Sequence, residues 1–562
     1  MDVLWQTRRA AASRVSVLRT AGFRHVLAAA LLLLVVTSIP FVYAAASAPD
    51  DQIFTGVLVN VHDTAQYLTW MRESGSHIFI DNRLTSEPNP PIYFNLHWWL
   101  FGRLAATTGI NLITSYHIMR VIAIPLLVVA VYWLCTLLVP DERRRRFAFW
   151  ITLVGAGLGW LWVADKFAFG LDGVPFPTDV YTTPGNAFYT MLISPHLTLA
   201  MALLLFTLGL AYVGVSRNRL GVSAAAGLTA FALGQGHAYD LVTVWGVLGL
   251  FGLVITVRDG LTRRAVLNLG LVYVISAPAA LYWVYVSSAA NPVWQQALAQ
   301  YDNLGVFTPD PMHLAILLGL RLIVALATYS GFVPVTAQDN RSIFLKSWMV
   351  AVLVLAYVPL KFRIMLLLGL ELPLSILALD GLLDHIVPWI QQHASGLLAR
   401  LRVTPAALAR WSPALFLMVL IPTNIYLYGW RLLDMSRHDY PYFLYRDDLA
   451  AIDWIDTHTD EADVVLSSLT IGHFVPGLAG NRVFLGSAVM TANFNHKNEE
   501  VNRFFDGQTD EAWRRDLLDR YDIRYLVYGN AEREVGDYDP DHSPFLVKVF
   551  DSQYTDVYQV MK

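Results

Sequence analysis

Apolar stretches of about twenty residues recur along this 562-residue chain and constrain its fold more than any other feature. Each stretch is long enough to cross the ~30 Å hydrocarbon core of a bilayer as a helix. Charged residues make up only 15% of the chain, whereas an ordinary soluble protein has about 25%. These features predict a polytopic α-helical membrane protein. The eleven predicted transmembrane helices lie near residues 26–46, 113–138, 147–164, 191–215, 220–235, 240–257, 265–288, 312–333, 345–360, 364–382 and 412–430.

Clusters of arginine in the short loops predict the orientation of these spans, because basic loops stay on the cytoplasmic side. With eleven spans, every cluster falls on the side of the N-terminus. We therefore expect a plasma-membrane protein with a cytoplasmic N-terminus and an extracytoplasmic C-terminus. The clusters are residues 143–146, 217–219, 258–264 and 400–410.

The first apolar run, residues 25–46, follows five arginines, as the apolar part of a signal peptide would. The run is longer than the about 7–15 residues of such a segment, so we expect a retained first span, with cleavage after Ala46 as the alternative.

Segment 91–107 is also apolar, but a crossing there would move the arginine clusters outside. We expect it to be an amphipathic helix at the outer interface, with a second such helix at 62–74.

The composition changes near residue 431 to a mixed, charged sequence large enough for one small domain. Residues 464–466 and 525–528 are expected to be buried strands, and 447–457 and 511–520 helices. The predicted organisation is a cytoplasmic N-terminus (1–24), a transmembrane domain (25–430) with its first outer loop at 47–112, and a C-terminal extracytoplasmic α/β domain (431–562).

The first outer loop is strongly acidic, since residues 50–99 contain six carboxylates and two arginines. Asp63 stands at the start of the predicted helix 62–74, where a carboxylate can accept a proton from a hydroxyl or bind a metal ion. The alternative is an acid that only stabilises the helix N-terminus.

Several polar side chains occur in or beside the spans, where they are costly and indicate a functional site. His196 alone is more typical of a packed histidine, whereas His237 and Asp240 are spaced for a hydrogen-bonded pair or a helix cap. Lys361 and Arg363 flank one residue in an outer turn and suit a phosphate or pyrophosphate, with snorkelling to the interface as the alternative.

These polar residues share a predicted side of the membrane, although they were not used to predict the orientation of the spans. Asp63, His196, His237, Asp240, Lys361 and Arg363 all fall on the outer side of the predicted topology. An acidic loop then faces a cationic turn across a membrane-embedded cavity. Transfer from a lipid phosphate carrier requires this pairing, because cations hold the leaving phosphate and a carboxylate activates the acceptor.

At these residues the sequence resembles the GT-C class of integral membrane glycosyltransferases, which includes protein mannosyltransferases, the aminoarabinose transferase of lipid A and oligosaccharyltransferases. The resemblance covers most of the chain. It is carried by VNVHDTAQYLTWMRES, TSEPNPPIYFNLHWWLFG, ISPH, GHAYDLVTV, LKFRIMLLLGLELPL and WIDTHTDEADVVLSSLTIGHFVPGLAGNRVFLG.

The resemblance implies that Asp63 is the catalytic aspartate. The second acidic residue usual in the class is not clear here, because His62 precedes Asp63 and Thr64 follows it. A divalent metal ion therefore stays open as a cofactor, with Asp63, His196, His237 and Asp240 as candidate ligands. Lys361 and Arg363 are assigned to the donor phosphate. The residues assigned to the substrate cavity are His62, Tyr67, Glu87, His196, His237 and Asp240.

The predicted function is transfer of a sugar from a polyprenyl-phosphate-linked donor to a glycan, lipid or protein acceptor on the extracytoplasmic face. Nucleic acid is not an expected partner, because the basic residues occur in short clusters between apolar runs. Two alternatives remain. A membrane transporter would explain the buried polar groups, although no paired halves are visible. An inactive scaffold of glycan assembly would explain the missing second acid.

Overall fold

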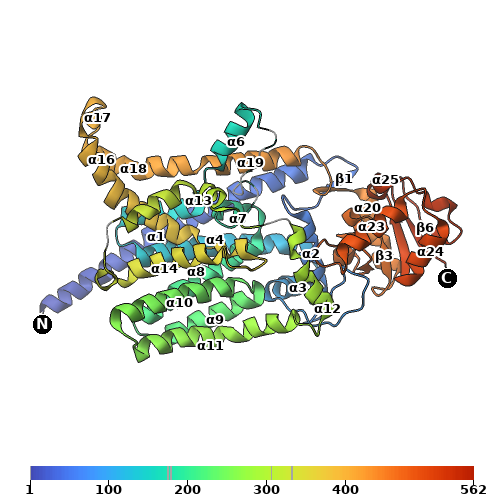
Figure 1. Cartoon of the computed structure of the whole chain (residues 1–562), viewed down its shortest axis with the longest axis horizontal. Coiled ribbons are helices and arrows are strands. Elements are labelled where there is room, and N and C mark those ends of the chain that lie inside the picture. The colour runs from blue at the N-terminus through green and yellow to red at the C-terminus, as the bar shows by residue number, and fades with distance from the viewer. Residues whose placement is uncertain are drawn as a thin grey trace.

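The computed structural model describes residues 2–171, 173, 176, 180, 182–304, 307–330 and 333–561. A bundle of long helices forms one part of the molecule and a five-stranded sheet with its helices forms the other (Figure 1). The two chain termini lie at opposite ends of the long axis, with the C-terminus beyond the sheet. The predicted loops 165–190 and 289–311 and the predicted span 312–333 are described only in part, because residues 172, 174–175, 177–179, 181, 305–306 and 331–332 lie outside the described residues.

The bundle is a multi-pass membrane domain. Within the described ranges, eight helices are long and apolar enough to cross a membrane, or nine if one bent pair counts as a span. The helices of the bundle are α1 (Asp2–Ser47), α4 (Leu112–Leu138), α5 (Glu142–Val154), α6 (Gly159–Ala168), α7 (Ala187–Ile193), α8 (Pro195–Ser216), α9 (Leu220–Gly236), α10 (Asp240–Asp259), α11 (Arg263–Val286), α13 (Pro311–Leu326), α14 (Asn340–Leu355), α15 (Glu371–Asp380), α16 (Val387–His393), α17 (Ser395–Arg400), α18 (Pro405–Leu420) and α19 (Pro422–Met435).

Each of the eleven predicted spans overlaps a helix, but three are not long or straight enough to count as single crossing helices. A fourth, predicted at 364–382, runs instead over Glu371–His393, because residues 363–367 form a 3-10 turn. Helices α9 and α14 have 17 and 16 residues. At 1.5 Å per residue they extend about 25 Å, short of a ~30 Å core. The predicted span 147–164 is broken, because α5 and α6 meet at an angle of 49°. The structure therefore supports eight or nine spans by length and composition.

The arginine-rich loops lie together at one end of the bundle. Arg258 donates to the carbonyl of Gln338 (2.9 Å) and to Asn340 (2.5 Å), and Asn340 contacts Ser216 (3.3 Å). Arg144 forms a bidentate pair with Asp384 through two bonds of 2.7 Å. This end is opposite to the C-terminal sheet (Figure 1).

The C-terminal part is a mixed sheet with strand order β4-β3-β5-β7-β6. β3 pairs in parallel with β4 and β5, whereas β7 is antiparallel to β5 and β6. The predicted strand 464–466 and helix 511–520 have the same bounds in the structure as β3 and α24. Its elements are α20 (Arg446–His458), β3 (Val464–Leu466), α21 (Leu469–Gly472), α22 (Val475–Leu478), β4 (Arg482–Val483), α23 (Phe494–Phe505), α24 (Glu511–Arg520), β5 (Ile523–Tyr528), α25 (Asn530–Val535), β6 (Leu546–Phe550) and β7 (Asp556–Val560).

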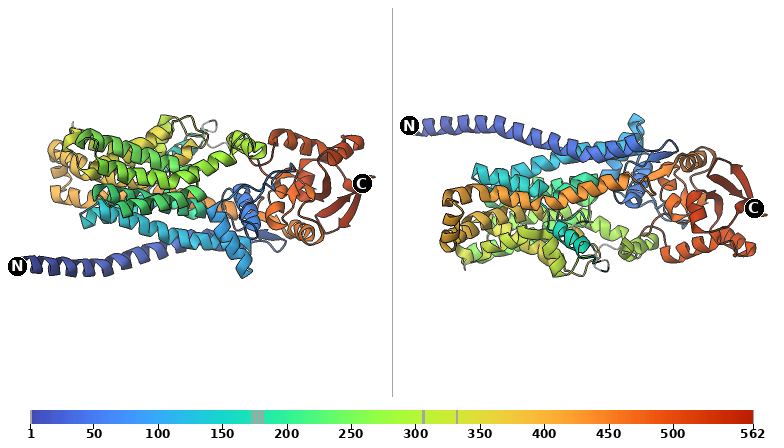
Figure 2. Two further views of the ribbon diagram at one scale, coloured as in Figure 1. Left: turned by 90° about the horizontal axis from the view of Figure 1, so that it is seen from below. Right: turned by 90° about the horizontal axis from the view of Figure 1, so that it is seen from above.

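The first loop is joined to this part by backbone pairing. β1 (Gln52–Phe54) pairs antiparallel with β2 (Phe443–Tyr445), and Thr85 forms a bridge with Leu485. Figure 2 shows the loop between the bundle and the sheet in both views. The loop therefore contacts the membrane domain on one side and the C-terminal part on the other.

The loop contains two helices, α2 (Val61–Ser74) and α3 (Leu96–Thr108), and both were expected. Asn95 caps α3 by accepting hydrogen bonds from the backbone of His97 and Trp98. The helices are in close contact, because a Cβ at Gly102 would lie 2.2 Å from the Met71 carbonyl oxygen. With 13 residues, α3 extends only about 20 Å and is too short to cross the membrane.

One expectation about α2 is wrong. Its apolar face was expected to lie toward the membrane, but Leu68, Trp70 and Met71 are buried within the protein. Trp70 packs against Tyr93, with ring centroids 4.6 Å apart, and the cluster includes residues of α3 and α4. Helical periodicity identifies an apolar face, but it does not distinguish a lipid partner from a protein partner.

Candidate functional site

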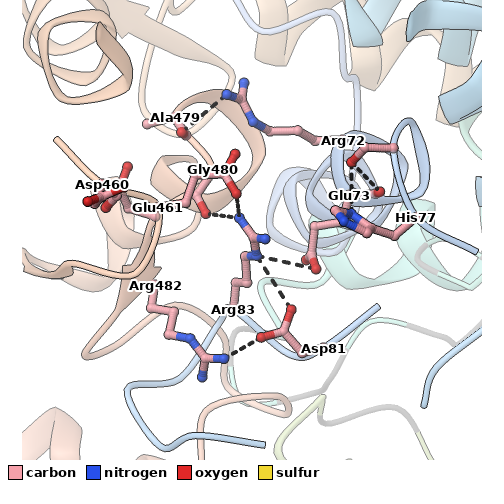
Figure 3. A network of polar contacts seen from close by, with 12 residues as sticks. Arg72, Glu73, His77, Asp81, Arg83, Asp460, Glu461, Ala479, Gly480 and Arg482 are labelled. Carbon is pink, nitrogen blue, oxygen red and sulfur yellow. Dashed lines mark hydrogen bonds and ion pairs between the residues drawn. The ribbon is translucent and has the colours of Figure 1, made fainter. Parts of the chain in front are cut away.

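Three of the six acidic groups of the first loop, Glu73, Asp81 and Glu87, form ion pairs in the described structure. One of the cations that they bind, Arg83, belongs to the loop itself (Figure 3). Arg83 contacts Glu461 (2.5 Å), the carbonyl of Gly480 (2.6 Å) and Glu73 (3.3 Å). Arg482 of β4 forms an ion pair with Asp81. These contacts hold the C-terminal end of α2 against the C-terminal part of the chain.

Glu73 and Asp81 lie in the same network. Burial raises the pKa of Glu73 well above its usual value, and the neighbouring Asp81 carboxylate raises it further. Burial also acts to raise the pKa of Asp81, but the neighbouring Glu73 and the positive charge of Arg482 outweigh it and lower that pKa. Asp81 is therefore the more acidic of the two carboxyl groups. The pair has a structural role.

Glu87 likewise makes a structural contact. It accepts a hydrogen bond from Lys497 (2.7 Å), whose side chain is 0% exposed and which also donates to Ser86 (2.8 Å). Glu87 also accepts from Thr85. Among the described residues its carboxylate has no contact with Asp63 or the histidines assigned to the same site.

Asp63 differs from these acids. It lies in the first turn of α2, is partly exposed, and its carboxylate has no ion pair or hydrogen bond within the described part of the chain. Burial raises its pKa to about 6. A carboxylate with this pKa is mostly ionised at neutral pH and is a better proton acceptor than an ordinary aspartate.

Among the tyrosines within electrostatic range of Asp63, three lie outside the spanning helices. Burial raises the pKa of Tyr67, Tyr239 and Tyr301, and the negative charge of Asp63 raises each of them further. This mutual effect places the three hydroxyl groups within electrostatic range of the carboxylate, although they come from α2, the α9–α10 turn and η2 (Tyr301–Leu304). All three remain neutral and can donate hydrogen bonds.

An array of rings connects Tyr67 to the other predicted site residues. Tyr67 stacks on Trp98 (4.5 Å between centroids) and meets the edge of His196 (4.7 Å). His196 lies 6.2 Å from His237. The predicted His237–Asp240 hydrogen bond is present, with 2.7 Å between Nδ1 and Oδ2.

The other face of the site contains the predicted cations. Phe362 stacks on Tyr239 at 5.2 Å, which places Lys361 and Arg363 beside the tyrosine. Lys361 donates to the Ala299 carbonyl (2.6 Å), forms an ion pair with Asp302 (3.4 Å) and is 45% exposed. Arg363 begins η5 (Arg363–Leu367), and its guanidinium group has no hydrogen-bond or ion-pair partner among the residues that the structure describes. We call Asp63, Tyr67, Tyr239, Tyr301 and this cationic turn the Asp63 site.

No family model and no curated protein matches the chain. Among solved structures, it is similar to the Archaeoglobus fulgidus oligosaccharyltransferase tethered with an acceptor peptide, with 13% identity, a TM-score of 0.49, and coverage of 89% of this chain and 69% of that chain. It is also similar to ArnT from Cupriavidus metallidurans bound to undecaprenyl phosphate, with 14% identity, a TM-score of 0.48, and coverage of 94% and 97%. Both structural neighbours are GT-C glycosyltransferases.

The four side chains suggested as metal ligands do not form a common ligand set. Both ring nitrogens of His237 are engaged, Nδ1 by Asp240 and Nε2 by the Tyr239 hydroxyl at 2.5 Å. Within the described ranges, no three histidine, cysteine or acidic side chains are grouped to hold a metal. The set Asp63, His196, His237 and Asp240, which the sequence suggested as ligands, is therefore not arranged as a metal site.

Sequence analysis missed Tyr239, Tyr301 and His97. His97 is buried against Gly236, where a Cβ would lie 2.3 Å from its ring, and burial lowers its pKa to about 3. Tyr239 could have been noticed, because it lies between His237 and Asp240 in the sequence. No local pattern connects Tyr301 to Asp63.

The His62 side chain is not part of the Asp63 site. Its ring is exposed and stacks on His473 of the C-terminal part, with 4.0 Å between centroids. It therefore lies where the start of α2 meets the C-terminal part.

Proposed function

We propose that this protein is a glycosyltransferase that moves a sugar from a polyprenyl-phosphate-linked donor to a hydroxyl or amide acceptor. One observation supports this proposal above others. Within the described residues the Asp63 carboxylate has no ion pair, and burial raises its pKa to about 6, which suits a general base. Tyr239 stacks on Phe362 in the turn that also holds Lys361, which is half-exposed, and Arg363, whose guanidinium has no ion pair among the described residues.

The chemistry follows from these groups. The acceptor attacks the anomeric carbon while Asp63 takes its proton. The bond between that carbon and the phosphate oxygen breaks, and its electron pair stays on the phosphate. The polyprenyl phosphate leaves with one more negative charge than it had in the donor. Lys361 and Arg363 stabilise this charge as it forms, which accelerates the step. A single displacement inverts the anomeric configuration.

The sidedness belongs to the same proposal. The arginine loops at one end of the bundle are typical of the cytoplasmic side. The Asp63 site and residues 431–562 would then be extracytoplasmic, with residues 1–24 in the cytoplasm of a plasma-membrane protein. The short helices α9 and α14 and the bent pair α5–α6 would complete eleven crossings. Tyr67, His196 and His62 would lie on the acceptor side, beneath the C-terminal domain.

Undecaprenyl phosphate is the probe that tests the donor site. It should raise the unfolding temperature of the purified protein in detergent, and Lys361→Ala/Arg363→Ala should remove this stabilisation. Arg437→Ala is the control, because Arg437 is 51% exposed and its ion pair is with Asp434, which is not part of the Asp63 site. No stabilisation of the wild type, or equal stabilisation of all three proteins, would contradict the proposed donor site and favour a transporter or a scaffold.

Transfer should depend on pH through Asp63. Since the base must be ionised, the rate should fall about tenfold per pH unit below about pH 6. The raised pKa means that the fold favours protonated Asp63, so protonation of this group adds stability and does not unfold the protein. Initial rates between pH 4.5 and 8, with unfolding temperatures at the same pH values, check this. A rate that stays constant down to pH 4.5 would contradict the role of Asp63.

A further inference from the structure

Asp240 is a buried carboxylate that the proposed reaction does not yet use. It is 0% exposed and its Oδ1 has no hydrogen-bond partner among the described residues. Its one recorded partner is the His237 ring, at 2.7 Å. A buried carboxylate costs folding free energy unless a cation compensates it. The hydrogen bond with the His237 ring offsets part of that cost.

The far side of the His237 ring contacts the Tyr239 hydroxyl. Tyr239 Oη lies 2.5 Å from Nε2, so Asp240, His237 and Tyr239 form one continuous hydrogen-bonded series. His237 is 7% exposed, whereas Tyr239 is partly exposed. The series therefore runs from the protein interior to a hydroxyl group at the Asp63 site.

The ring of Tyr239 fixes where this hydroxyl lies. It stacks on Phe362, the residue between the two cations, and its hydroxyl is within electrostatic range of Asp63. A donor phosphate held by Lys361 and Arg363 would thus lie next to the Tyr239 hydroxyl, whose position is already fixed by its hydrogen bond with His237. Prepositioned donors stabilise charge that develops in the transition state, because they need no reorganisation.

We propose that Tyr239 is a catalytic residue that donates its hydroxyl hydrogen to the leaving phosphate, with His237 and Asp240 as its positioning residues. In this arrangement Asp240 accepts from Nδ1–H, Nε2–H donates to the tyrosine oxygen, and the tyrosine hydrogen points to the phosphate oxygen that gains the electron pair. No proton is transferred in these contacts. This inference rests on the proposed function, because it requires a phosphate at the cationic turn.

The Tyr239→Phe variant tests the hydroxyl while keeping the ring stack on Phe362. Polyprenyl phosphate release should fall about 10- to 100-fold in kcat with KM changed little, because the lost contact strengthens only in the transition state. Asp240→Asn should lower kcat in the same direction. The second pKa of bound undecaprenyl phosphate, followed by phosphorus NMR, should rise in Tyr239→Phe because a hydrogen bond to the dianion is lost. A merely structural role for Tyr239 would leave this pKa unchanged.

Tyr285→Phe is the matched control, since this tyrosine is 55% exposed and lies at the end of α11. Suppose that the wild type binds undecaprenyl phosphate, and that Tyr239→Phe has the wild-type kcat and an unchanged phosphate pKa. This result would overturn the inference about Tyr239 but not the proposed donor site. Failure of the wild type to bind the lipid phosphate would overturn the proposed donor site first.

Discussion

Asp63→Asn is expected to reduce sugar transfer by about 100-fold or more, because general-base catalysis contributes about 10²- to 10⁴-fold. Asparagine keeps the size of the side chain but cannot accept the proton of the acceptor. The carboxylate has no hydrogen-bond or ion-pair partner in the described structure, so the substitution breaks no recorded contact. Release of polyprenyl phosphate from lipid-linked sugars in native membranes, followed by mass spectrometry, measures the loss.

The control for this variant is Asp51→Asn, an exposed carboxylate of the same loop whose backbone, not its side chain, contacts Arg446. It should transfer sugar at the wild-type rate. Binding of undecaprenyl phosphate should survive in Asp63→Asn, because Asp63 acts on the acceptor. Undiminished transfer by Asp63→Asn would remove Asp63 from the chemistry.

Glu87→Ala is expected to destabilise the protein by about 3 kcal/mol, because it leaves the buried Lys497 ammonium without its counter-ion. The estimate is at the low end of such losses, since Glu87 itself is 30% exposed. Urea unfolding of the full-length protein in detergent, followed by fluorescence of the C-terminal Trp454 and Trp513, measures the change. Glu461→Ala is the control and should cost less than about 1 kcal/mol, because Glu461 is 58% exposed.

The double variant Glu87→Ala/Lys497→Met separates structure from substrate binding. Removing both charges should recover most of the lost stability, because no buried charge then remains unpaired. Transfer should recover with it if Glu87 only joins the loop to the C-terminal part. If the double variant regains stability but not transfer, Glu87 would instead belong to the substrate site, as the sequence suggested.

Local patterns predicted the local features of the fold well. Local sequence patterns predicted the bounds of β3 and α24, and the three-residue spacing of His237 and Asp240 predicted their hydrogen bond. These features depend on neighbours in the sequence. The predicted spans are helical for the same reason, but helix length and breaks, as at Gly155–Leu158 between α5 and α6, depend on packing against other helices.

Long-range contacts could not be predicted. Glu87 and Lys497 are 410 residues apart in the chain, so nothing near Glu87 indicated that it would be paired. Tyr301 and Asp63 approach each other only because η2 and α2 meet at the same end of the bundle. The face of α2 was assigned to lipid because its cover, α3 and the C-terminal part, comes from outside the helix.

A cryo-electron microscopy structure of the protein with undecaprenyl phosphate tests the central claim most directly, through the position of the phosphorus atom. We expect the phosphate between Lys361 and Arg363, within hydrogen-bonding distance of the Tyr239 hydroxyl, with the Asp63 carboxylate facing the space beside it. A phosphate bound among the arginine loops at the other end of the bundle, or any position out of reach of Lys361 and Arg363, would contradict the proposed transferase site.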